Sequence, residues 1–278
     1  NLEDGRVWFG SAAASEIHDF EWLQRHLPDD GSVQLNSLTN DYTILLLAGP
    51  HARQVLQAST RLDCSPQSFR WLDVKTGFVG IAPATIMAVS YSGEDAFEIH
   101  VPNNQLYAAY LSLRKAGEAY DLKLFGSMAV DSMRLEKGYL HWKADLITEF
   151  NPFETGLSRF VTMGKEFIGK DALQLMMKKG LRKQLVSLVI DCDHAPSHGG
   201  ASVYQHDQLI GTVTSAEWGH RTGKNIALAF IDPDYAAIGT SLMVDVLGIK
   251  TPATVVTPTM FDPENSRLKP AELMASAD

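Results

Sequence analysis

The sequence predicts an α+β fold, in which a body of helices and antiparallel strands is followed by a C-terminal β-barrel-like domain. Two observations support this prediction. The first 180 residues alternate between helical spacing and strand-like runs, whereas the remainder consists of short β-rich runs divided by turn residues. In addition, 278 residues with 45% hydrophobic composition can bury a sizeable core in one large domain or two packed ones.

The elements of the body follow from hydrophobic periodicity. We expect strands at residues 7–9 and 42–47 and helices at residues 15–26, 51–59 and 121–137. Gly49 and Pro50 separate a strand from a helix, since proline suits a first helical turn. Gly138 ends the last of these helices, because glycine readily adopts the left-handed conformation of a helix cap.

The tail has a different pattern. A helix at residues 170–179 ends in two lysines before Gly180, which marks its cap. Beyond it we expect strands at residues 185–191, 201–205, 209–214, 226–231, 241–246 and 252–258. Evenly spaced short strands are typical of a small barrel. The sequence therefore predicts two domains, residues 1–182 and residues 183–278.

Charge and cysteine usage exclude several classes of function. A formal net charge of −9 opposes non-specific binding to nucleic acid. Cys64 and Cys192 lie in no metal-binding or disulfide pattern, which indicates a reducing compartment: the cytoplasm, or the mitochondrial matrix in a eukaryote. His194 and His198 have helical spacing, but Pro196 between them disfavours a helix, so we expect no metal site.

We expect neither a membrane-spanning helix in the sequence nor a secretory signal in its first residues. The longest apolar runs are shorter or more interrupted than the roughly 20 residues of a membrane-spanning helix, so we expect no membrane span. The first six residues have neither the basic start nor the apolar stretch of a secretory signal. Because the first residue is Asn1 rather than Met, we expect the chain to be a processed or excised part of something longer.

A predicted hairpin at residues 84–102 carries the first candidate site. Strands at residues 84–91 and 96–101 flank a turn rich in serine, glycine and acidic residues. If Tyr91 pairs with Ala96, Glu98 is a diagonal neighbour of Tyr91 on the same face, within about 7–8 Å. A phenol and a carboxylate then converge where the carboxylate can accept paired hydrogen bonds from a flat heterocycle. The alternative is a solvent-facing tyrosine and glutamate on an ordinary edge hairpin.

Arg134 is the second candidate. It follows Asp131 by three residues, so the two side chains can pair along the helix surface. The aromatic residues Tyr139, His141 and Trp142 come just after the glycine that ends the helix. Aromatic rings beside a positive charge suit a pocket for an aromatic ligand with an acidic tail, or equally a helix end that packs on the core.

Several segments, in order, resemble the glycine-cleavage T-protein (aminomethyltransferase) superfamily. They are YSGEDAFEIHVP, DSMRLEKGY, NPFETGLSRFV, KEFIGKDAL and the tail segments GTVTS and IALAFIDP. Each alone is weak, and their joint occurrence is the signal. The opening AAASEIHDFEWLQRHLP, together with RLEKGYLHW, is most similar to the C-terminal folate-binding half of dimethylglycine and sarcosine dehydrogenases.

The resemblance implies tetrahydrofolate as cofactor, with Tyr91, Glu98 and Arg134 as binding residues and Glu98 hydrogen-bonded to the pterin ring. Val130 and Arg159 replace an arginine and a tryptophan that contact folate in the T-protein, which favours the dehydrogenase branch. In that branch the resemblance implies an upstream segment or partner chain that carries FAD, and a small N-methyl amine as substrate. The aspartate proposed to assist transfer lies in that upstream segment, so we assign no catalytic residue. The alternatives are a free aminomethyltransferase and a non-catalytic folate-binding module.

Overall fold

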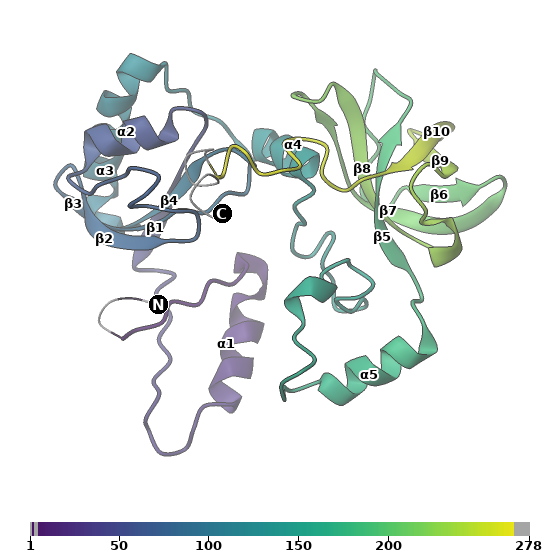
Figure 1. Cartoon of the computed structure of the whole chain (residues 1–278), viewed down its shortest axis with the longest axis horizontal. Helices are drawn as coiled ribbons and strands as arrows, with labels where there is room; N and C mark the ends of the chain where they lie inside the picture. Colours follow the sequence, from purple (N-terminus) through teal and green to yellow (C-terminus); the bar gives the residue numbers. More distant parts are fainter. Residues whose placement is uncertain (1, 3–4, 270–278) are drawn as a thin grey trace. The chain divides into compact units, whose positions relative to one another are not determined.

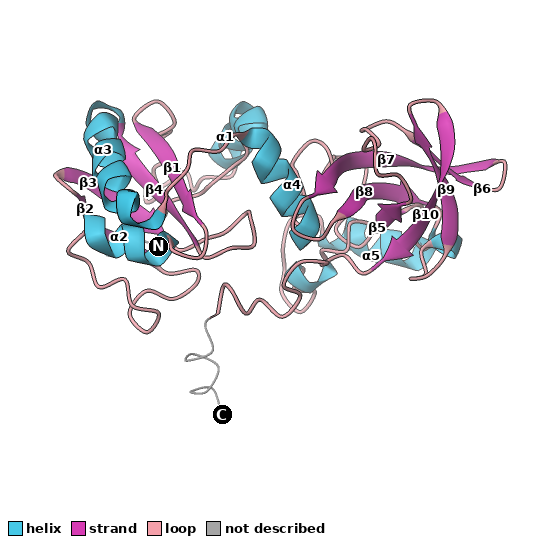
Figure 2. Cartoon of the chain, turned by 90° about the horizontal axis from the view of Figure 1, so that it is seen from above, coloured by secondary structure: helices cyan, strands magenta, loops and turns pink. Residues whose placement is uncertain are grey.

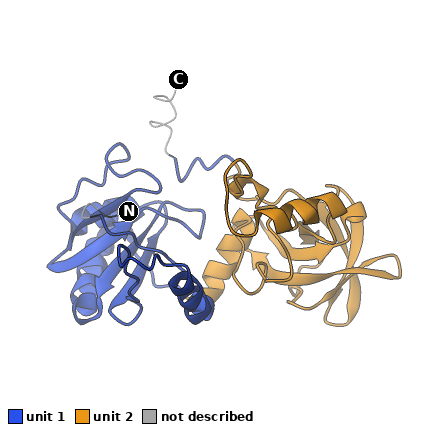
Figure 3. Ribbon diagram, turned by 90° about the horizontal axis from the view of Figure 1, so that it is seen from below, with its two compact units in different colours: residues 1–125, 264–278 blue, residues 126–263 orange. Residues whose placement is uncertain are grey.

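The computed structural model describes residue 2 and residues 5–269 (Figure 1). The chain forms two compact units. Unit 1 comprises residues 1–125 and 264–278, and unit 2 comprises residues 126–263 (Figure 3). Compactness thus groups residues 126–182 with the barrel. The boundary that we place at residue 183 divides the chain by pattern, at the change from mixed to all-β structure, and it stays a proposal.

Unit 1 contains a four-stranded antiparallel sheet in the order β1-β4-β3-β2. Its strands are β1 (Tyr42–Ala48), β2 (Val74–Val79), β3 (Ala82–Met87) and β4 (Ala96–Pro102). Its helices are α1 (Glu16–Arg25), α2 (Ala52–Ser59) and α3 (Leu106–Gly117), with 3-10 turns at Ala13–Ser15, Asn103–Gln105 and Glu118–Tyr120. Two of these elements, β2 and α3, are additions to the sequence prediction.

The core of unit 1 lies between this sheet and helices α2 and α3, which both cover one face (Figure 2). Alternation along β4 explains the arrangement, because successive side chains point to opposite faces. Phe97, Ile99 and Val101 are fully buried in the core, as the sequence predicts. The intervening residues Glu98 and His100 therefore point to the opposite face of the sheet.

Residues 7–9 form no strand, which corrects the sequence prediction. Val7 and Phe9 are 69% and 67% exposed. Among the described residues no strand pairs with this segment. A strand is stabilised by hydrogen bonds to a neighbour, so an apolar run without that neighbour stays irregular.

Unit 2 is built on a closed antiparallel barrel in the order β10-β5-β8-β7-β6-β9 (Figure 1). Its strands are β5 (Gln184–Ile190), β6 (Ser202–Gln205), β7 (Gln208–Gly219), β8 (Lys224–Ile231), β9 (Ser241–Val246) and β10 (Ile249–Val256). The helices are α4 (Ser127–Lys137) and α5 (Lys170–Lys179), with 3-10 turns at Ser158–Phe160 and Pro233–Tyr235. Closure leaves no free strand edges in the barrel. This confirms the predicted α+β class with a C-terminal barrel.

Helix α4 ends where the sequence predicts and begins later. Gly138 adopts a φ of +76°, and a Cβ there would lie 2.5 Å from the carbonyl oxygen of Pro258, so only glycine fits. The predicted start at residue 121 is wrong, because Asp121 has a left-handed φ of +52° and the helix begins at Ser127. A left-handed residue cannot continue a right-handed helix.

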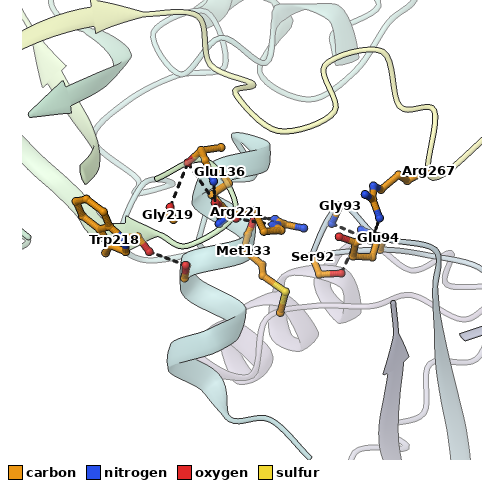
Figure 4. Close-up of polar contacts among 12 residues, drawn as sticks. Ser92, Gly93, Glu94, Met133, Glu136, Trp218, Gly219, Arg221 and Arg267 are labelled. Carbon is orange, nitrogen blue, oxygen red and sulfur yellow. Dashed lines mark hydrogen bonds and ion pairs between the residues drawn. The ribbon is translucent and has the colours of Figure 1, made fainter. Parts of the chain in front are cut away.

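A buried carboxylate fastens α4 to the β7–β8 hairpin. Both backbone N–H groups of Arg221 and Thr222 donate to Glu136 Oε1, at 2.7 and 2.8 Å, and Arg221 Nε donates to Oε2 at 2.5 Å. The Oγ of Ser132, one turn earlier, donates to the carbonyl oxygen of Trp218 at 2.6 Å (Figure 4). Charge-assisted bonds of this kind hold the helix in one orientation on the barrel.

The turn at residues 151–157 contains a second buried carboxylate, Glu154. It accepts hydrogen bonds from Arg182 Nε at 3.1 Å and from the backbone N–H and side-chain amide of Asn151 at 3.0 and 2.9 Å. Burial raises the pKa of Glu154, but the hydrogen bonds from Arg182 and Asn151 outweigh burial and hold it below its ordinary value of 4.5.

The lowered pKa of Glu154 predicts that the protein loses stability in acid. A folded-state pKa below the unfolded one contributes stability that is complete above the unfolded value and is lost as pH falls through the folded value. We expect wild type to be more stable than Glu154→Gln near pH 7 and the difference to shrink below about pH 4.5. Urea unfolding at pH 7, 5, 4 and 3.5 measures it, and a difference that does not change with pH would contradict the assignment.

Candidate functional site

The outer face of the unit 1 sheet, opposite helices α2 and α3, carries the predicted carboxylate. Glu98 lies near the middle of this face, on β4. The residues directly opposite Glu98 and His100 on the neighbouring strands are Leu46 and Ile44 on β1 and Met87 and Thr85 on β3. Three of these four neighbours are apolar, so the carboxylate stands on a largely apolar surface.

The carboxylate of Glu98 has acceptor capacity to spare. Its side chain is 37% exposed, and it makes no hydrogen bond to any residue that the structure describes. Among the described residues, Glu98 has an ion-pair contact with His100, whose Nε2 lies 3.5 Å from Glu98 Oε2. An ionised carboxylate offers about four lone-pair sites and accepts paired N–H groups well. This arrangement suits a flat heterocycle that presents two adjacent N–H donors.

An aromatic cluster adjoins the carboxylate on the same face. The indole ring of Trp8 packs edge-on against the rings of Tyr42 and His100, with centroid distances of 5.3 and 5.5 Å. Trp8 Nε1 and His100 Nε2 are buried and have no hydrogen-bond partner among the described residues. Trp8 belongs to the segment that we predicted as a strand. Its side chain contacts the sheet face although its backbone does not join the sheet.

The predicted strand at residues 84–91 ends at Met87, so Tyr91 does not pair with Ala96. Pairing between β3 and β4 ends at Met87 and Glu98, and Ala96 pairs with Ala48 of β1 instead. Tyr91 lies in the connection formed by residues 88–95, which leaves the sheet directly after the cross-strand partner of Glu98. Tyr91 and Glu98 therefore belong to one hairpin, with the tyrosine in its loop.

Side chains within the loop explain this outcome. Ser90 Oγ accepts the backbone N–H of Gly93 at 3.0 Å, and Ser92 Oγ accepts that of Glu94 at 3.3 Å (Figure 4). Gly93 has a φ of +77°, which glycine adopts without strain. Serine side chains that bond to nearby backbone groups compete with strand pairing. The two strands therefore end earlier than alternation alone predicts.

Two arginines hold the acidic residues at the end of this loop. Arg53 donates from Nε and Nη2 to the two carboxylate oxygens of Asp95, at 2.9 and 3.0 Å. Burial raises the pKa of Asp95 above its ordinary value, although the hydrogen bonds from Arg53 act in the opposite direction. The bidentate geometry is that of an ionised carboxylate. Arg267 Nη1 donates to the buried Glu94 at 2.9 Å (Figure 4). The loop that carries Tyr91 is thus fixed at its end by charge-assisted bonds.

Arg134 lies in unit 2, on α4, and its guanidinium is engaged within the chain. Its side chain is 4% exposed and donates to Asp131, to the carbonyl oxygen of Tyr139, to Asp145 at 2.7 Å and to Ser215 at 2.9 Å. The predicted pair with Asp131 is confirmed, at 3.3 Å. The side chain of Asp145 has no exposed area. This network gives the Arg134 side chain a structural role within the fold. The contact of Arg134 with a cofactor stays a prediction.

Sequence reasoning missed His100 and Trp8. Alternation contained a signal for His100, since it lies two residues after Glu98 and shares its face of the strand. No sequence signal places Trp8 on that face, because the contact joins an irregular segment to a distant strand. Across the described residues, no group of three or more metal-ligating side chains is assembled. In the same part of the chain no helix is long and apolar enough to cross a bilayer.

Family models match most of the chain. The GCVT N-terminal domain matches residues 1–165, and the Glycine cleavage T-protein C-terminal barrel domain matches residues 183–262. Since the first model alone covers more than half of the chain, the protein belongs to the glycine-cleavage T-protein (GCVT) family.

Relatives fall into two groups. Human mitochondrial dimethylglycine dehydrogenase is 31% identical over 264 residues, which are 93% of this chain and 30% of that protein. Mouse mitochondrial sarcosine dehydrogenase is 29% identical and is covered to 29%. The aminomethyltransferase of Caldanaerobacter subterraneus subsp. tengcongensis is 33% identical over 247 residues, with 88% of this chain and 65% of that protein covered. The chain thus spans under a third of the dehydrogenases and about two thirds of the aminomethyltransferase.

One solved structure supports the fold. The glycine cleavage system aminomethyltransferase T from Bartonella henselae matches with a TM-score of 0.79 and 23% identity, over 90% of this chain and 67% of that one. The predicted resemblance to the T-protein superfamily is confirmed by these comparisons together.

Proposed function

We propose that this chain is the tetrahydrofolate-binding portion of a flavin-dependent N-methyl amine dehydrogenase of the dimethylglycine or sarcosine type. Members of the GCVT family include enzymes of folate-dependent one-carbon transfer. The observation that carries the proposal is Glu98, a carboxylate on an apolar sheet face without a hydrogen-bond partner among the described residues. Its unfilled acceptor sites fit the adjacent N–H groups of a pterin ring.

Each predicted binding residue has a place in this proposal. Glu98 accepts the pterin N–H groups, and Tyr91, in the adjoining loop, lines the same pocket. Arg134 is the third predicted contact, for which its buried network offers a competing structural account. Calorimetric titration of the chain with a stable reduced folate tests the proposal directly. Saturable binding with one site per chain supports it, and the absence of binding by a folded chain refutes it.

In this proposal the protein has two tasks: it positions the folate ring, and it keeps water away from the reacting carbon unit. Bound tetrahydrofolate supplies the nucleophilic nitrogen that captures the one-carbon unit from an iminium or from formaldehyde. Glu98 orients the ring, because two hydrogen bonds to one carboxylate fix both its distance and its plane. The apolar neighbours of Glu98 limit water near the bound ring, which protects a hydrolysable carbon unit.

The proposed reaction needs a partner that generates the carbon unit. Oxidation of an amine needs a redox group, and we propose FAD in an upstream segment or a separate chain, which also carries the catalytic aspartate. The similarity to dehydrogenases of which this chain spans about 30% supports this partition. The compartment is then the cytoplasm, or the mitochondrial matrix in a eukaryote, since two of these relatives are named as mitochondrial.

The purified chain is therefore expected to form no methylenetetrahydrofolate from dimethylglycine or sarcosine. In this proposal the chain receives the carbon unit, and the flavin of the upstream portion oxidises the amine. Addition of the flavin-bearing portion should restore amine-dependent formation, measured by separating the folate products. Full amine-dependent turnover by the isolated chain, without flavin or added polypeptide, would show that the partition is wrong.

A free aminomethyltransferase is the second candidate. It is favoured by the 33% identity to the Caldanaerobacter enzyme, of which this chain covers 65%. That activity would take its carbon unit from an aminomethyl group on a carrier protein and would need no flavin. Product formation from an aminomethylated carrier, in the absence of FAD, distinguishes it from the dehydrogenase proposal. Folate affinity without either activity would instead identify a non-catalytic folate-binding module.

A further inference from the structure

Among the described residues, His100 is a titratable neighbour of Glu98, the residue that we propose binds the pterin ring. Both residues lie on β4 and point to the outer face of the sheet, two positions apart. The side chain of His100 is 13% exposed, much less than that of Glu98. The imidazole therefore meets less solvent than the carboxylate does.

The contact between the two side chains is close but incomplete. His100 Nε2 lies 3.5 Å from Glu98 Oε2, which is an ion-pair distance when the ring is protonated. The same nitrogen is buried and forms no hydrogen bond to any described residue. A buried polar atom without a partner is unfavourable and is rare in folded proteins.

The surroundings of His100 leave Glu98 as its ionic partner. Trp8 packs edge-on against the imidazole, Ile44 lies opposite on β1, and Thr85 lies opposite on β3. Tyr42, which contacts the same indole ring, is the other titratable residue of the cluster. Among these described neighbours, Glu98 is the carboxylate, and its Oε2 lies 3.5 Å from His100 Nε2. The charge of a protonated His100 therefore interacts chiefly with the carboxylate of Glu98.

We propose that His100 is a positioning residue that orients the carboxylate of Glu98 for its ligand and makes ligand affinity depend on pH. This inference rests on the proposed folate-binding role of Glu98. A protonated His100 donates to one lone pair of Oε2 and fixes the carboxylate, and the remaining acceptor sites receive the N–H groups of the heterocycle. A neutral imidazole holds the carboxylate less firmly, because a charge-assisted hydrogen bond is about twice as strong as a neutral one.

The affinity of wild type for a reduced folate should fall about three- to tenfold between pH 5.5 and pH 8, since the charged state of histidine changes in this range. His100→Gln keeps a polar side chain without a titratable group, so its affinity should be lower at pH 5.5 and nearly independent of pH. The matched control is His198→Gln, on the barrel, where the ring bonds to the carbonyl oxygen of Gly199. This control variant should keep the pH profile of wild type. Because the ligand is the same for all variants, a difference in pH profile between His100→Gln and the control does not come from titration of the ligand.

A second measurement does not depend on folate. The ring resonances of His100, followed by NMR from pH 5 to 8 in wild type and in Glu98→Gln, report the coupling of the two side chains. The pH dependence of these resonances should differ between wild type and Glu98→Gln, whereas the resonances of His198 should not change. An unchanged pH dependence for His100 would overturn the inference even if folate binds at Glu98. A changed pH dependence together with a folate affinity that neither variant alters would refute both the positioning role and the folate assignment.

Discussion

Glu98→Ala is expected to lower the affinity of the chain for a reduced folate by roughly ten- to a hundredfold. A hydrogen bond to a charged group contributes about 1.5–3 kcal/mol, and 1.4 kcal/mol corresponds to one decade in the dissociation constant. The alanine variant removes the acceptor of the pterin N–H groups from a sheet face whose other side chains are largely apolar. None of the described residues paired with Glu98 or His100 on that face is a carboxylate.

Two variants make this experiment specific. Glu98→Gln keeps the shape of the side chain and one carbonyl acceptor, and we expect an intermediate loss. Glu118→Ala, at an exposed position of unit 1, changes the net charge by the same amount and should leave the affinity unchanged. Calorimetry with circular dichroism as a test of folding measures all three. Unchanged affinity for a folded Glu98→Ala variant would refute the site.

Arg134→Ala is expected to cost about 3–5 kcal/mol in the free energy of unfolding, because it leaves a buried charge without its ionic partner. That charge is the carboxylate of Asp145, whose side chain has no exposed area. Its remaining hydrogen bonds come from the backbone N–H of His141 and from the hydroxyls of Thr214 and Ser215. Neutral donors compensate an ionised carboxylate less well than a guanidinium does.

Urea unfolding of the wild type and of two arginine variants measures this effect. Arg159→Ala, at an exposed position in the same unit, should change stability by no more than about 0.5 kcal/mol. The result also decides between the two accounts of Arg134. A variant that keeps its stability and loses folate affinity would identify Arg134 as a cofactor contact, as the sequence analysis predicts. A large loss of stability supports the structural account.

Strand β4 shows which features follow from the sequence and which depend on the tertiary structure. Alternation in residues 96–102 correctly assigns Phe97, Ile99 and Val101 to the core and therefore places Glu98 on the other face. It does not reveal where β3 stops pairing. That point depends on serine side chains in the loop and on Arg53, which is 42 residues from its partner Asp95.

By itself the sequence determined the α+β class, the C-terminal barrel, the ends of α4 and α5, and the position of Glu98 on a sheet face. These features arise from periodicity, glycine caps and turn residues, which act over a few positions. Tertiary structure alone decided the burial of Arg134, the place of Tyr91 and the contact of Trp8 with His100. Two partners of Arg134, Asp145 and Ser215, are 11 and 81 residues away in the chain. Burial and hydrogen-bond partners at such separations depend on how the chain packs, so no local pattern encodes them.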